Sequence, residues 1–281
     1  MSLWGYHNLA LNVYFLVYNI FHTNYEECLI TTNHNLYASI TLSTLTGISL
    51  SKEFISVPKG GSASNLNKTI KLKRVRADSR IGPHNKTILS IIFGTLLGDG
   101  YAEYRCKGNG TRIRFYQEGN HLAYLLYLHK LLADLGYCKS TIPKIQKRLG
   151  KKGVVKNILR FNSWTYSSLN WVQELWYVDG LKIVPSNIGE YLDPLALAIW
   201  IMDDGSKLGK GLKLSTNSFN YSDCLLLVKV LYDNFYLKAT VQSAGNLKPQ
   251  YHIYIWKESM PLLCDIVEPY VHSSMKYKLG K

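Results

Sequence analysis

A chain of 281 residues, 47% hydrophobic and 19% charged, is long enough to bury one large core or two cores of about 100 residues each. Its 33 Lys and Arg against 19 Asp and Glu leave a formal net charge of +14, which favours a polyanionic partner, above all a nucleic acid. The five cysteines show no C-x-x-C spacing, so we expect neither a disulfide framework nor a cysteine zinc site.

Residues 1–70 differ from the rest of the chain because their basic and acidic residues cancel, which places the whole positive excess in residues 71–281. The apolar run at residues 9–20 is interrupted by Asn12 and Asn19, and it is shorter than the roughly 20 residues that span a bilayer. We therefore expect no membrane segment. No basic residue precedes the run and no small-residue cleavage site follows it, which argues against a secretory signal, and an Arg-rich amphipathic transit peptide is absent, so we expect no import signal. We predict that residues 1–78 are an N-terminal extension and linker.

From residue 79 onward, the same order of predicted helices and strands occurs twice. The first copy opens with an apolar helix at residues 86–98, and the second with one at residues 194–202. Each helix runs into an acidic residue followed by a glycine, with Asp99 in the first copy and Asp204 in the second. This repetition indicates a duplicated subdomain.

The elements that follow the two opening helices also match. A glycine-containing hairpin comes next in both copies. An amphipathic helix follows, at residues 121–132 and 222–231, and then two more strands and a closing helix. The pattern predicts an α+β fold of two αββαββα subdomains, residues 79–187 and 188–281, related by a pseudo-twofold axis.

The position of the two acids is chemically unusual. Asp99 and Asp204 stand at the negative end of a helix, which disfavours a carboxylate by up to about 1 kcal/mol. The following glycine would permit the positive φ that often ends a helix. A divalent cation would offset the unfavourable charge, and carboxylates with helix-end carbonyls suit Mg²⁺. We therefore expect Asp99, Asp204, the Gly98 carbonyl and Asp203 around the metal, with a purely structural role as the alternative for Asp203.

Two glycines predict how the acids come together. Gly94 and Gly98 lie four residues apart on one helix face, which lets a partner backbone approach closely. If the two opening helices pack side by side, Asp99 and Asp204 meet at their ends. Two acids sharing metal ions suit phosphodiester hydrolysis, in which the ions activate a water and stabilise the leaving oxygen.

Residues 92–100 (Ile-Phe-Gly-Thr-Leu-Leu-Gly-Asp-Gly) and 197–205 (Leu-Ala-Ile-Trp-Ile-Met-Asp-Asp-Gly) resemble the two signature motifs of the LAGLIDADG homing endonucleases, in their two-motif, single-chain, intron-encoded form. The likeness covers roughly residues 80–281. It implies that the motif helices form the interface between subdomains, that two antiparallel sheets form saddles over the DNA major groove, and that Asp99 and Asp204 bind the metals. Lys182 and Lys278 match basic residues that help activate water or stabilise charge.

The second motif departs from the family pattern at two positions. Ile199 replaces a glycine, and Asp203 stands where Ala or Gly is usual. We expect the helix contact to be less close, or asymmetric, in this half. Both motif acids are present, so activity remains the expectation.

DNA recognition is assigned to the strands, because a two-stranded ribbon fits the major groove and alternate positions face the DNA and the helices. The candidate contacts are Arg105, Lys107, Arg112 and Arg114 in the first copy, and Lys207, Lys210, Lys213 and Lys238 in the second. A loop-like cluster supplies backbone affinity through Lys144, Lys147, Arg148, Lys151 and Lys152. His121 and His129 lack a metal-binding spacing and are expected to be surface or packed histidines.

The sequence thus predicts a monomeric, site-specific double-strand DNA endonuclease for intron homing, using Mg²⁺ with Mn²⁺ as an alternative. An RNA maturase that assists splicing of a group I intron is the strongest rival, because it needs the basic surface but not the acids. A DNA-binding regulator without catalysis is a third hypothesis. The 21 tyrosines, with abundant Asn, Leu and Ile, fit an AT-rich organelle genome, which favours a mitochondrial protein with a chloroplast as the alternative.

Overall fold

The computed structural model describes residues 75–150, 153–245 and 249–280, which all lie in one compact unit, Ile70–Lys281. Most of the predicted extension, residues 1–74, lies outside the described residues. No helix in the described ranges has the length and apolar character needed to cross a bilayer.

The first half of this unit contains α2 (Lys86–Leu97), β1 (Tyr101–Arg105), β2 (Gly110–Glu118), α3 (Leu122–Asp134), β3 (Gln146–Leu149), β4 (Val155–Asn162) and α4 (Asn170–Trp176). The second half contains α6 (Pro194–Asp204), β7 (Gly205–Leu208), β8 (Gly211–Ser215), α7 (Tyr221–Phe235), β9 (Ala239–Ser243), β10 (Tyr251–Ile255) and α8 (Met260–Val267). The predicted order of elements is therefore present in both halves.

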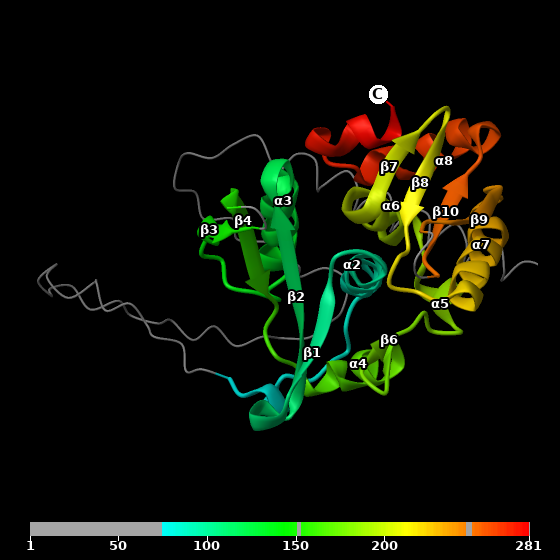
Figure 1. Ribbon diagram of the computed structural model, residues 1–281. Helices are drawn as coiled ribbons and strands as arrows, with labels where there is room; N and C mark the ends of the chain where they lie inside the picture. The colour runs from blue at the N-terminus through cyan, green and yellow to red at the C-terminus, as the bar shows by residue number, and fades with distance from the viewer. Residues whose placement is uncertain (1–74, 151–152, 246–248, 281) are drawn as a thin grey trace, which may run out of the picture. The chain divides into compact units, whose positions relative to one another are not determined.

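The two halves form separate antiparallel sheets of the same topology. The first sheet has the order β1-β2-β4-β3 and the second has the order β7-β8-β10-β9. Helix α3 packs against β2 and β4, while α7 packs against β9 and β10. Figure 1 shows α2 and α6 between the two sheets. The α+β fold with two matching antiparallel sheets is confirmed.

A short connection between the halves was not anticipated from the sequence. After α4 the chain forms a small hairpin, β5 (Tyr177–Val178) with β6 (Leu181–Lys182), and then the short helix α5 (Ile188–Tyr191). Asp179 and Gly180 make its turn, both with positive φ. This hairpin ends at Lys182 and thereby carries that lysine back toward the end of α2.

Side-chain caps start the two central helices. Asn85 accepts a hydrogen bond from the Ile88 amide before α2, and Asp193 accepts one from the Ala196 amide before α6. Asp193 also accepts a hydrogen bond of 2.6 Å from Ser90 of α2, which joins the helices directly. Both helices are almost entirely buried, as expected for the central layer of a core.

The contact between α2 and α6 depends on small residues. A Cβ atom at Gly94 would lie 2.6 Å from the Ala196 carbonyl oxygen and 3.0 Å from the Ile199 Cβ. A Cβ atom at Gly98 would lie 2.4 Å from the Cβ of Asp203. The predicted close approach at Gly94 and Gly98 is therefore observed, and the larger Ile199 and Asp203 side chains fill the space that these glycines leave.

The glycines that border the motif acids do not act as predicted. Gly205 has φ −72°, and Gly100 likewise has no positive φ, so neither glycine that follows a motif acid adopts the positive φ expected at a helix end. A Cβ at Gly205 would lie 2.5 Å from the Ile201 carbonyl oxygen, and one at Gly100 would lie 2.7 Å from the Thr95 carbonyl oxygen. These positions exclude a side chain because backbone passes too close, and not because of their dihedral angles.

Candidate active site

Three carboxyl groups gather where α2 and α6 end. Asp99 follows the Gly98 cap of α2 and remains open to solvent, Asp204 is the last residue of α6 and is partly buried, and Asp203 is buried. Desolvation, reinforced by the charge of Asp99, raises the pKa of Asp204 to about 7. Desolvation also raises the pKa of Asp99, whose carboxylate is bonded to the buried Gln117 although part of the residue reaches the solvent. Asp99 and Asp204, which come from different halves, thus lie close enough for the charge of Asp99 to raise the pKa of Asp204.

Gln117 links these acids across the two halves, which the sequence did not reveal. Its Nε2 donates to Asp99 Oδ2 at 2.6 Å and to Asp203 Oδ1 at 3.1 Å. Thr95 donates to the other oxygen of Asp203 at 3.2 Å. The signal that could have found Gln117 is its position on β2, where it follows Ile113 and Phe115 on the buried face. A polar side chain at an inward strand position needs a partner.

Further polar groups extend this network toward the surface. The Gln117 Oε1 lies 3.2 Å from His121 Nδ1, and His121 Nε2 lies 3.0 Å from the Tyr277 hydroxyl. His121 is therefore held by polar contacts beside Asp99, as a packed histidine, while His129 bonds to the Lys139 carbonyl. The Tyr124 hydroxyl lies close to Asp203, but finds no hydrogen-bond partner of ordinary geometry among the described residues.

The structure places both predicted lysines at this site in equivalent positions. Lys182 Nζ donates to the carbonyls of Gly98 and Gly100 at 3.3 and 3.1 Å. Lys278 Nζ donates to the carbonyls of Met202 and Asp203. The Lys182 ammonium thus satisfies carbonyls at the end of α2, and the Lys278 ammonium satisfies carbonyls at the end of α6. Positive charge is favourable at this end of a helix. Burial lowers the pKa of Lys182 to about 8 and also lowers that of Lys278.

Replacing Lys278 with methionine is expected to lower the free energy of unfolding by about 2–3 kcal/mol. Two buried carbonyls would lose a charged donor, and the three acids would lose a counter-charge. Denaturant unfolding measures the change. Lys276→Met is the control, because Lys276 is a partly exposed lysine two residues away that faces Glu268 at 3.5 Å. Equal stability of the two variants would contradict the structural role of Lys278.

The donor set fits a magnesium ion. No cluster of three His, Cys, Asp or Glu side chains with metal-binding geometry occurs in the described part of the chain. Mg²⁺ does not need such a cage, because it binds through one or two carboxylates and keeps waters or substrate phosphates as further ligands. Asp99 and Asp204 provide two carboxylates whose ionised form is disfavoured without a cation. The Gly98 carbonyl bonds to Lys182 and retains a second lone pair.

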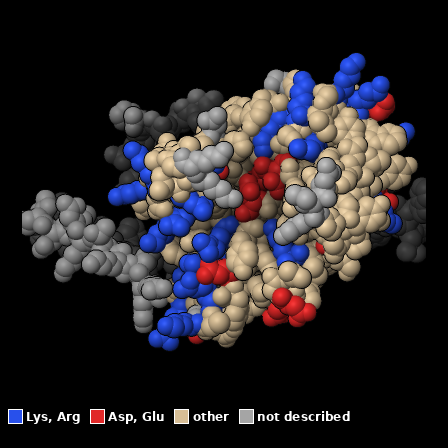
Figure 2. All heavy atoms as spheres, viewed as in Figure 1, with Lys and Arg blue, Asp and Glu red and all other residues tan. Residues whose placement is uncertain are grey.

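An open pocket of about 610 Å³ lies at these acids. Asp99, Gln117, His121 and Asp203 line it, together with Lys156 of β4 and Glu118, which form an ion pair at 2.8 Å. In Figure 2, red atoms gather at the centre of the visible face, with blue atoms on both sides. A phosphodiester could approach acids that are flanked by positive charge.

The predicted contacts on the first sheet separate by strand alternation. Arg112 and Arg114 lie on the solvent face of β2, opposite to its buried residues, and both contact Glu103. Arg105 also pairs with Glu103, at 3.2 Å. The register of β3 with β4 puts Arg148 on this same face, but Lys147 on the opposite one. Treating Lys147 and Arg148 as a single loop cluster was wrong, because both lie within a strand.

The second sheet separates its lysines in the same way. Lys213 lies on the solvent face of β8 and pairs in register with Ser206 and Tyr254. Lys207 is in register with the buried Leu212 and points to the other face, where its side chain lies beside Gly280. The prediction that Lys207 faces the DNA together with Lys213 is therefore corrected. The remaining candidates are exposed: Lys107 in the β1–β2 connection, Lys210 in the β7–β8 turn and Lys238 before β9. The strand pattern also adds Arg160 and Lys156, which were not predicted.

Comparison with known proteins agrees with this architecture. Residues 89–263 match the family model of the LAGLIDADG DNA endonuclease family. The chain is 45% identical over 289 residues to the cytochrome b mRNA maturase bI2 of Saccharomyces cerevisiae, an alignment that covers 100% of this chain and 67% of the relative. It is 40% identical over 149 residues to the intron-encoded endonuclease ai4 of Dictyostelium discoideum, which covers 52% of this chain and 93% of that protein.

A solved structure shares the fold. The homing endonuclease I-WcaI, determined bound to its DNA recognition sequence, superposes with a TM-score of 0.63 at 24% identity, covering 79% of this chain and 95% of that one. The duplicated topology, the paired motif helices and the family match all lead to the same assignment. The chain belongs to the LAGLIDADG DNA endonuclease family.

Proposed function

We propose that this protein is a site-specific double-strand DNA endonuclease of intron homing that acts as a monomer with Mg²⁺. The observation that carries the proposal is the meeting of Asp99 and Asp204, from opposite halves of one chain, with the pKa of Asp204 raised to about 7. Because each half of the chain contributes one acid, the arrangement suits cleavage of both strands of a duplex. A divalent cation, Mg²⁺ or Mn²⁺, would activate water and stabilise the leaving oxygen when bound.

The side chains around the acids have distinct roles in this proposal. Asp99 and Asp204 would hold the cation, and Gln117 orients Asp99 through its 2.6 Å hydrogen bond. Lys182 and Lys278 hold the helix-end carbonyls and offset the charge that develops on the phosphate. Asp203, bonded to Gln117 and Thr95, is a positioning residue behind the site and not a ligand.

The sheet faces bind the DNA in this proposal. Arg112, Arg114 and Arg148 are on the first face and Lys213 is on the second, with Arg105, Lys107, Lys210 and Lys238 at their margins. Contacts to phosphates position the duplex, while contacts to base edges specify the sequence. Lys147 and Lys207, on the opposite faces, are assigned at most to backbone phosphates that reach the sheet edges.

A second function is favoured by one observation, the 45% identity with a protein named as a maturase of cytochrome b mRNA. We propose group I intron RNA as the alternative partner. A maturase needs the basic surface and not the acids. The name of this relative also supports the proposal of a protein encoded by an intron in a mitochondrial genome.

One experiment separates the two functions. Purified protein is incubated with Mg²⁺ and a plasmid that carries the intronless host sequence, and splicing of the intron is measured in parallel. We expect linearised plasmid with the parent and none with the Asp99→Asn/Asp204→Asn double variant. Splicing rescued equally by the parent and the double variant, without cleavage by either, would identify a maturase. Unaltered cleavage by the double variant would refute the nuclease mechanism.

A further inference from the structure

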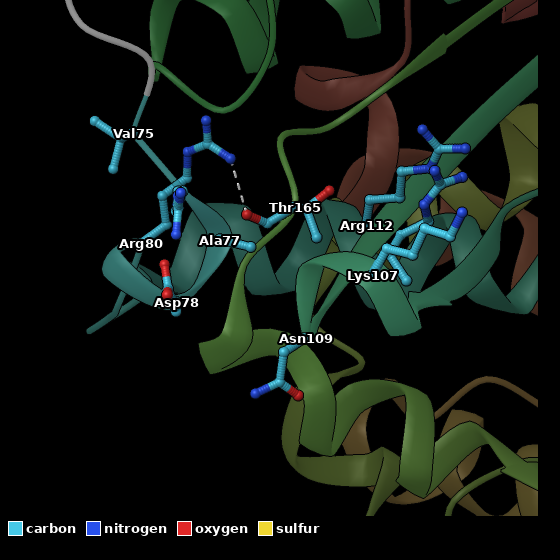
Figure 3. Close-up of a pocket in the computed structure, with 10 residues that line it drawn as sticks. Val75, Ala77, Asp78, Arg80, Lys107, Asn109, Arg112 and Thr165 are labelled. Atoms are coloured by element: carbon cyan, nitrogen blue, oxygen red, sulfur yellow. Dashed lines mark hydrogen bonds between the residues drawn. The ribbon is translucent and has the colours of Figure 1, made fainter.

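A second pocket lies away from the acids, at the outer end of the first sheet. It has a volume of about 750 Å³ and is lined by the segment before α2, the β1–β2 connection and the loop at Thr165. We call it the arginine pocket, and its charged lining residues are Arg76, Asp78, Arg80, Arg105, Lys107 and Arg112. Figure 3 shows Arg80 reaching it from the first of these segments, and Lys107 and Arg112 from the hairpin. Five positive charges face one negative charge.

The segment that builds one wall of the pocket is fixed to the first half. Arg80 Nη1 donates to the Thr165 carbonyl at 3.0 Å, and its guanidinium lies 5.1 Å from the centre of the Trp164 ring. His84 bonds to the Tyr137 hydroxyl at 2.7 Å and to Ser168 at 2.9 Å. These residues precede the family-matched range, which begins at residue 89, yet they are integral to the folded unit. This wall is therefore a feature that the family match does not describe.

Four of the chain's eight arginines line this pocket, and none of the eight lies in the second half of the folded unit. Arg112 lines the pocket and also a neighbouring depression with Arg114, Arg148 and Arg160. A guanidinium binds phosphate through two parallel hydrogen bonds, which a lysine cannot do. Glu103 holds Arg105 and Arg112 in place, so both guanidinium groups are positioned before any ligand arrives.

We propose that the arginine pocket binds a phosphodiester of the nucleic acid backbone, outside the site of cleavage. The inference rests on the proposed nucleic-acid function and extends it to residues 76–80. Arg105 ends β1 and is six residues from Asp99, so at about 3.3 Å per residue it lies at most roughly 20 Å from that acid. With about 3.4 Å between phosphates along a strand, the pocket reaches the backbone within about six base pairs of the cleaved bond. The phosphodiester can come from duplex DNA or from RNA.

The test removes the two exposed charges of the pocket that have no structural hydrogen bond to the fold in the described residues. Arg76→Gln/Lys107→Gln is compared with Lys130→Gln/Lys229→Gln, which removes the same charge from exposed lysines on α3 and α7. Affinity for a mixed-sequence duplex and for a single-stranded RNA is measured by fluorescence anisotropy over a series of salt concentrations. Thermal melts verify that both variants remain folded.

We expect the pocket variant to reduce the slope of log affinity against log salt on the duplex by about 1.8, since each phosphate contact contributes about 0.9. The control should keep the parent's slope. A reduction of about 1.4 on RNA alone would support the pocket and identify RNA as the source of the phosphate. Unchanged slopes on both probes, or equal losses in the control, would overturn the pocket while leaving nucleic-acid binding intact. A parent that binds neither probe would overturn the proposed function as well.

Discussion

Asp204→Asn is expected to slow DNA cleavage strongly and, at the same time, to stabilise the metal-free protein at neutral pH. Loss of a carboxylate that holds the cation should reduce the cleavage rate by about 10²–10³-fold, as loss of a preorganised electrostatic group does. The gain in stability follows from the burial of Asp204 and the nearby charge of Asp99, which raise its pKa to about 7. Asparagine keeps the shape and removes the charge.

The stabilisation that Asp204→Asn brings depends on pH, and its direction follows from the pKa shift. A carboxyl with a pKa near 7 in the folded state and near 3.8 when unfolded binds its proton more tightly when folded. Its contribution therefore destabilises the folded state progressively as pH rises from about 4 to about 7, and is constant above that. The melting temperature of Asp204→Asn minus that of the parent should rise over this window. A difference of about 1–2 kcal/mol corresponds to roughly 2–8 °C in a domain of this size.

Metal and a matched control complete the test. Mg²⁺ should raise the melting temperature of the parent, because it binds the folded state, and should do so less in Asp204→Asn. Asp179→Asn removes the same charge at an exposed turn position with positive φ, which asparagine also accepts. The control should retain cleavage and stability. A pH-independent difference in melting temperature between Asp204→Asn and the parent would contradict the burial argument.

Gly94→Ala is expected to destabilise the protein by about 2 kcal/mol. The added methyl group would lie 2.6 Å from the Ala196 carbonyl oxygen and 2.9 Å from the Ala196 Cα, so backbone and not a flexible side chain must move. This cost exceeds the gain of about 1 kcal/mol that alanine brings to a helix interior. Denaturant unfolding measures the net change. Cleavage should fall too, because separated helices separate Asp99 from Asp204.

Gly189→Ala is the matched control for this variant. Gly189 is also helical, in α5, but a Cβ there would meet nothing nearer than 3.6 Å, which is an ordinary contact with Val230. The control should be as stable as the parent or slightly more so. If Gly94→Ala matched Gly189→Ala in stability, the close contact of α2 with α6 would not be a determinant of the fold.

The sequence and the structure agree best where the information is local. Residues 86–97 and 194–204 form helices because apolar side chains run through them and Asn85 and Asp193 cap them. The acids at their ends follow directly from these boundaries. Strand alternation was recognised as the rule for DNA contacts, but Lys147 and Lys207 could not be sorted from Arg148 and Lys213 until the register was known.

By itself, the sequence predicted the duplication and the elements of each half, and it singled out Asp99, Asp204, Lys182 and Lys278 as candidate site residues. It could do so because periodicity and motif spacing are properties of short stretches of chain. Only the tertiary structure decided that Gln117 joins Asp99 to Asp203, since that bond needs a strand of one half placed against the helix ends of both. It also decided that Arg80 meets Thr165, 85 residues away along the chain, to form the arginine pocket. Such contacts depend on how whole elements pack, and packing distances are not encoded in the spacing of residues.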